Sequence, residues 1–169
     1  MKNLMKVLMQ PAEILLEQDG YISPVLFLIK DKKLITPPIL IRYTGDEQVD
    51  EKAEVVYKAG FTAGVLDADC IIIIHDAAFR TIESLDGMDV TDSPLSFPKS
   101  MRTECIMMIG IELPSGKKEM LITAYKGGDG TPVEFLRDFK MPEDVPFDSR
   151  FTDLAIKGWE DADNAKAER

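Results

Sequence analysis

The residues best equipped for chemistry in this sequence stand together at the end of one apolar run. Cys70 is followed by four consecutive isoleucines, and then come His75 and Asp76. His75 is the only histidine in the chain. A run without polar residues on either side is typical of a central strand that is covered on both faces. The sequence therefore predicts that His75 and Asp76 lie at the end of a buried strand over residues 69–79.

A third ionisable residue joins this pair if the connection at 81–100 links antiparallel neighbours. Glu104, near the start of the next strand, then lies opposite either Asp76 or His75. Like charges that face each other destabilise a strand pair, whereas a facing carboxylate raises the pKa of a histidine. We therefore expect the second register. In it His75 pairs with a carboxylate, Glu104 first and Asp76 second, in a structural role.

An alternative function for these side chains is metal binding. His75, Asp76 and Glu104 have the ligand types of a divalent-metal site, and such a site is typical of a metal-dependent hydrolase. The adjoining connection offers further carboxylates from Asp86, Asp89 and Asp92. No HExxH, HxH or EF-hand spacing is present, so the sequence favours a protein without catalytic residues, bound metal or cofactor.

Nucleophilic and phosphate-binding chemistry have less support. Cys70 and Cys105 both lie in strand-like runs, where buried free thiols are expected rather than a disulfide or a nucleophile. No GxSxG sequence presents a serine to His75. The glycine-rich stretch 127–130 is not followed by GK[ST] or by a helical pattern, which favours a turn between strands.

The order of the predicted elements is that of one α+β domain. Apolar stripes, caps and turn residues indicate about three helices and a sheet of five or six strands, mostly antiparallel, in the order α-β-β-α-β-β-β-(β)-α. Thr44 and Glu47 form a capping box before the second helix, in which Gly60 and Gly64 share one face and are expected to approach the sheet. The domain should span 1–159, followed by a polar, frayed tail at 160–169. The expected helices are 3–18, 44–66 and 149–159, and the expected strands are 21–30, 34–43, 69–79, 101–113, 118–126 and 131–136.

Three further signals refine this order. Gly20 is expected to end the first helix, and Ser149 to cap the last one. Pro24, Pro37 and Pro38 have no N–H to donate, so parts of the first hairpin should lie at an edge of the sheet.

Composition narrows the class of function. The chain has 169 residues and a formal net charge of −10, with 45% hydrophobic residues. A folded protein with this charge and no basic cluster is expected to bind neither nucleic acid nor an anionic membrane. Lys6 interrupts the apolar amino terminus and no cleavage site follows, so we expect a cytoplasmic protein.

The sequence therefore favours a small acidic cytoplasmic module that binds another protein or associates with itself as a homodimer. Three helices of modest length leave part of a two-sided sheet without cover, which a second copy would complete. The alternatives are the hydrolase centred on His75, Asp76 and Glu104 and an acidic inhibitor that mimics nucleic acid.

Overall fold

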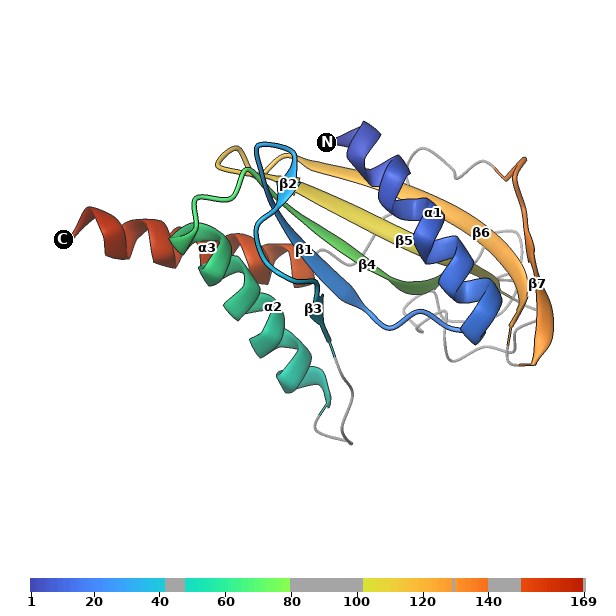
Figure 1. Cartoon of the computed structure of the whole chain (residues 1–169). Coiled ribbons are helices and arrows are strands. Elements are labelled where there is room, and N and C mark those ends of the chain that lie inside the picture. Colours follow the sequence, from blue (N-terminus) through green and yellow to red (C-terminus); the bar gives the residue numbers. More distant parts are fainter. Residues whose placement is uncertain (42–47, 80–101, 129, 140–149, 169) are drawn as a thin grey trace, which may run out of the picture.

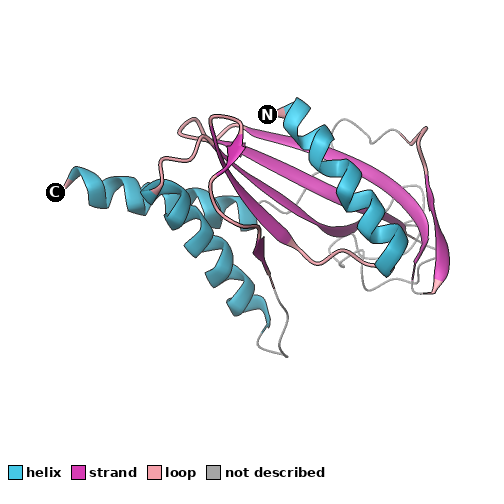
Figure 2. Cartoon of the chain, in the orientation of Figure 1, coloured by secondary structure: helices cyan, strands magenta, loops and turns pink. Residues whose placement is uncertain are grey.

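Three helices and a seven-stranded sheet are built from the residues that the computed structural model describes, 1–41, 48–79, 102–128, 130–139 and 150–168 (Figures 1 and 2). The chain is an α+β domain, as the sequence predicted. The elements in chain order are α1 (Lys2–Asp19), β1 (Val25–Lys30), β2 (Lys33–Leu34), β3 (Ile39–Leu40), α2 (Gln48–Val65), β4 (Cys70–Phe79), β5 (Thr103–Glu112), β6 (Lys118–Gly128), β7 (Thr131–Phe135) and α3 (Arg150–Ala167).

The isoleucine strand β4 lies inside the sheet. The strand order is β2-β1-β4-β5-β6-β7, β3 also pairs with β1, and the pairs along it are antiparallel. β4 pairs with β5 along its whole length, so the long connection after it does join antiparallel neighbours. β3 and β4 both run antiparallel to β1, and therefore point the same way on either side of it.

The first hairpin forms the edge of the sheet, as its prolines predicted. Asp31 and Lys32 make its turn with positive φ angles of 50° and 61°, the backbone of a tight two-residue hairpin. Its second arm is broken into β2 and β3, with Pro37 and Pro38 in the gap. Because proline has no N–H to donate to a ladder, the break belongs at an edge.

The side chains of the inner strands alternate between two apolar cores. On one face Ile72, Ile74 and Ile106 pack with Met5 and Leu16 of α1. On the other face a second core contains Ile71, Ile73, Leu26, Val56 of α2 and Ala155 of α3. This alternation is the reason that the isoleucine run has no polar member.

Two glycines of α2 have a different role from the one expected. They allow α2 to approach α3, not the sheet. A Cβ added at Gly60 would lie 2.0 Å from the main-chain oxygen of Ala155, and one at Gly64 would lie 2.6 Å from the Cβ of Ala162. Gly158 of α3 allows the same close approach from the other side, because a Cβ added there would lie 2.1 Å from the main-chain oxygen of Tyr57 in α2.

The carboxyl-terminal region also departs from expectation. Residues 160–167 continue α3 as helix and do not form a frayed tail. Ala162 is buried against α2, and Lys166 Nζ donates to the main-chain oxygen of Gly64 at 2.6 Å. Residues 160–167 are mostly polar, and these contacts with α2 provide the tertiary packing that keeps them helical. The expected caps Thr44, Glu47 and Ser149 lie outside the described residues.

Candidate binding groove

The end of β4 does not assemble the predicted cluster. Asp76 lies opposite Ile106, His75 opposite Met107, and Glu104 opposite Ala78. Both expected registers are therefore wrong. Relative to a direct pair of Asp76 and Glu104, the strands are shifted by two residues, which keeps every side chain on its face but separates the two carboxylates.

His75 points away from the two acids. Successive residues of a strand face opposite sides, so Asp76 and Glu104 lie on the α1 face and His75 on the other. Its Nδ1 lies 2.8 Å from the main-chain oxygen of Asp76, within reach of a hydrogen bond. The described residues contain no group of three His, Cys, Asp or Glu side chains that could hold a metal ion. Asp86, Asp89 and Asp92, the further ligands of that hypothesis, lie outside the described part of the chain.

Asp76 ties the segment after α1 to the sheet. Its Oδ2 accepts a hydrogen bond from the Ile22 N–H at 3.0 Å, and its Oδ1 accepts one from the Tyr125 hydroxyl at 3.4 Å. Burial raises the pKa of Asp76, and the nearby Glu104 raises it further, although these two hydrogen bonds lower it. Glu104 is held in turn by Arg102, whose Nε donates to it at 2.6 Å. These acids therefore have structural partners.

The cysteines are free and buried, as predicted. Desolvation raises the pKa of Cys70 to about 11 and that of Cys105 to about 12. Since the thiolate is the reactive form of a cysteine, these raised pKa values disfavour a nucleophilic role at neutral pH.

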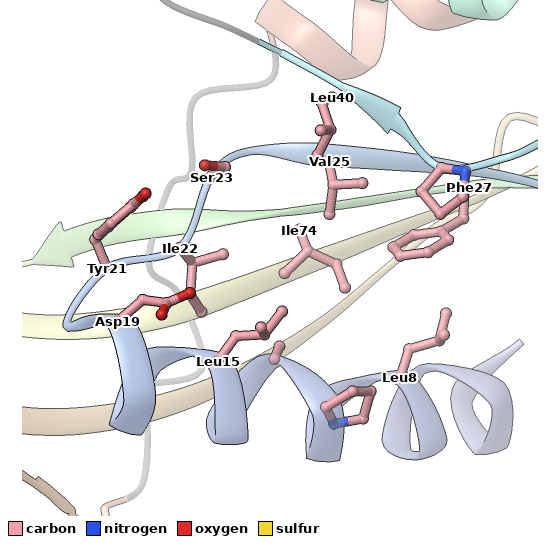
Figure 3. A pocket seen from close by; sticks show the side chains of 13 residues that line it. Leu8, Leu15, Asp19, Tyr21, Ile22, Ser23, Val25, Phe27, Leu40 and Ile74 are labelled. Carbon is pink, nitrogen blue, oxygen red and sulfur yellow. The ribbon is translucent and has the colours of Figure 1, made fainter.

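A groove of about 340 Å³ opens beside α1 on the same face as Asp76 (Figure 3). α1 packs mainly over β5, β6 and β7, so the face of β1 is left beside it. Val25 and Phe27 of β1 and Ile74 of β4 line the groove between the helix and the sheet edge. Because α1 lies to one side of the sheet, the groove has a helix for one wall and the sheet for its floor.

The walls of this groove are apolar and accessible. Leu8 and Leu15 come from α1, and Leu40 of β3 lies across from them (Figure 3). Leu15 and Leu40 are each 49% exposed and Tyr21 is 60% exposed. Exposed apolar side chains gathered in one concave surface are typical of a binding site.

Polar groups stand at one end of the groove. Asp19, the last residue of α1, and Ser23 belong to its lining. Gly20 ends the helix in the left-handed conformation, and its N–H bonds to the oxygen of Leu16 at 2.9 Å. Ile22, which also lines the groove, is held by Asp76. Asp76 therefore fixes the position of one residue of the groove lining, although it does not line the groove itself.

Sequence reasoning located part of this surface without recognising it. The stripe on residues 3–18 includes Leu8 and Leu15, and the proline-bearing hairpin was placed at an edge. The overlooked clue is that α1 has more apolar residues than one buried stripe needs, which indicates a second apolar surface on the helix. Met5, Met9, Ala12 and Leu16 are buried, while Val7, Ile14 and Leu15 are exposed.

Comparison with protein-family models, with curated proteins and with solved structures finds no match for this chain. Its function must therefore be argued from the groove and its surroundings. In the described ranges, no helix has the length and apolar character to cross a bilayer.

Proposed function

We propose that this protein is a non-enzymatic binding module, and that the groove beside α1 receives an apolar helix from another polypeptide chain. The observation that carries the proposal is the groove itself. It combines a helical wall, a floor of sheet side chains and half-exposed apolar residues.

The opposite face of the sheet supports a helix as the occupant. There α2 and α3 lie side by side, with α2 in contact with β1 and β4 and α3 in contact with β5. The sheet is therefore wide enough for two helices. On the groove face the described residues supply one, α1, and a helix in the groove would pack against both α1 and β1.

A small molecule fits the groove less well. Sites for small ligands enclose most of the ligand surface. Here Leu15 and Leu40 are each 49% exposed and Tyr21 is 60% exposed, so the groove leaves much of its apolar lining open to solvent. An open apolar groove is the form in which proteins receive an amphipathic helix.

The test uses a fluorescent model helix as the probe. It carries leucine on one face and equal numbers of lysine and glutamate on the other, so that it has no net charge. We expect saturable binding in fluorescence anisotropy, and a loss of about tenfold or more in affinity for Leu40→Glu, because a carboxylate would have to be desolvated against the bound helix.

Leu34→Glu is the matched control. Leu34 lies on β2 outside the groove lining and has the same exposed fraction, 49%, as Leu40. It should leave the affinity unchanged, and a peptide with its leucines scrambled should not bind. Equal losses for both variants, or no binding by the wild-type protein at concentrations at which sedimentation shows it to be monomeric, would overturn the proposal.

A further inference from the structure

We propose that the helix received by the groove is α1 of a second copy of this chain, laid antiparallel across a two-fold axis. This inference rests on the proposed function and names its partner. It makes the groove the interface of a homodimer.

The first support is a second apolar stripe on α1. Val7 and Ile14 are 64% and 51% exposed and stand seven residues apart, as do Leu8 and Leu15 in the groove wall. Apolar residues repeated at this interval form the contact line of paired helices. The stripe that α1 uses in its own core is a separate one, which includes Met5 and Leu16.

The charged flank of α1 faces elsewhere. Glu13 forms a two-pronged ion pair with Arg137, both N–O distances being 2.8 Å, and accepts a hydrogen bond from Thr123 of β6. With about 3.6 residues per turn, Val7 and Ile14 lie on the solvent side of α1, next to Leu8 and Leu15 of the groove wall, whereas the ion pair is on the side of β6. A contact made through the stripe would not have to desolvate this pair, which avoids a large cost of association.

The second support is the shape of the surface. Val7 and Ile14 project from the exposed side of α1 and so form a ridge, and the groove begins at the neighbouring Leu8 and Leu15, which line it (Figure 3). A two-fold axis brings the same surface of two copies together. A ridge next to a groove satisfies that symmetry, because each ridge enters the groove of the other copy. With Pro11 at the axis, Val7 of one copy meets Leu15 of the other.

The third support is the charge at the two ends of α1. Its first turn has no acidic residue, Met1 provides no side-chain cap, and its last turn has no basic residue. Asp19 instead places a carboxylate at the carboxyl end, where the helix dipole is unfavourable to it. In the antiparallel pair, Asp19 of each copy lies beside the first turn of the other helix, where its unpaired N–H groups favour an anion.

The experiment is sedimentation velocity on the full chain. We expect a dimer at tens of micromolar, and an increase of about tenfold or more in the dissociation constant for Val7→Glu, since the carboxylate would be buried at the ridge. Val65→Glu is the matched control, because Val65 is an exposed valine of α2 that does not belong to the groove lining. It should leave the dissociation constant unchanged.

A cross-link tests the antiparallel arrangement. In Pro11→Cys the two new thiols lie at the axis, and mild oxidation should give a covalent dimer. Val65→Cys should not, and the native thiols are buried and do not compete. A monomeric wild-type protein, equal effects of the two glutamate variants, or equal cross-linking of the two cysteine variants would overturn the inference. If the dimer inference fails in this way but the wild-type protein binds the model helix and Leu40→Glu does not, the proposed function holds and the partner is a different chain.

Discussion

The two faces of the sheet are covered in different ways. On one, α2 and α3 pack so closely that main-chain atoms of one helix occupy the space of side chains on the other, at Gly60 and Gly158. On the other, α1 leaves a groove beside it, bordered by exposed leucines. Close packing of backbones stabilises a fold but leaves no room for a ligand. The comparison therefore separates a face that is closed by packing from a face that keeps an open groove, which we propose as the binding site.

The faces also differ in their polar contacts. The described side-chain contacts between α2 and α3 include the Tyr57 hydroxyl, which donates to Asp161 at 2.8 Å near the surface. On the α1 face, by contrast, Asp76 carries a half-buried network beneath the groove. A buried carboxylate costs stability unless it has partners, so its position beside the groove indicates that it shapes this surface. Three substitutions test these differences.

Ile72→Asp should have the largest effect. Ile72 is fully buried between β4 and α1, and burying an unpaired carboxylate costs several kcal/mol out of a total stability of about 5–15 kcal/mol. We expect an unfolded protein by circular dichroism, whereas Leu34→Asp at the exposed edge should melt like the wild type. A native melting curve for Ile72→Asp would contradict the central position of β4.

Gly60→Ala should have the next largest effect. Alanine favours a helix over glycine by about 1 kcal/mol, but its Cβ would lie 2.0 Å from a main-chain oxygen of Ala155. The two helices must separate, so we expect a net loss of about 1–2 kcal/mol in the free energy of unfolding. Urea denaturation measures it, with Val65→Ala on the exposed side of α2 as the control. Unchanged stability would show that the α2–α3 contact is loose.

Asp76→Asn should have the smallest effect, and one that depends on pH. Because burial raises the pKa of Asp76 in the folded protein, the ionised side chain lowers stability above that pKa. As the pH falls through it, the proton binds and the cost disappears. We therefore expect Asp76→Asn to gain most over the wild type near neutral pH, and less in acid.

The measurement is the melting temperature of the wild-type protein and of Asp76→Asn, compared from neutral to acid pH. If the difference in melting temperature between the two proteins does not change with pH, the substitution acts through the hydrogen bonds of residue 76 and not through the charge of Asp76. If Asp76→Asn no longer binds the fluorescent model helix although its stability is unchanged, the contact between Asp76 and Ile22 positions the groove lining.

Local chemistry allowed much of the fold to be predicted. Four consecutive β-branched isoleucines favour a strand covered on both faces, and β4 is such a strand in the structure. Gly20 ends α1 because glycine adopts a positive φ, here 75°, without strain. The prolines at 37 and 38 have no N–H to donate, which put the hairpin at an edge.

Only the tertiary structure decided the rest, because those features depend on residues far apart in the chain. A shift of two residues between β4 and β5 keeps the apolar pattern intact, so the sequence could not show that Glu104 faces Ala78. Gly60 and Gly64 looked the same whether a sheet or a helix approached them; the approach of α3 gave them their role. The groove exists because α1 lies over β5, β6 and β7 and not over β1. That placement is set by the packing of the whole sheet, which no single segment encodes.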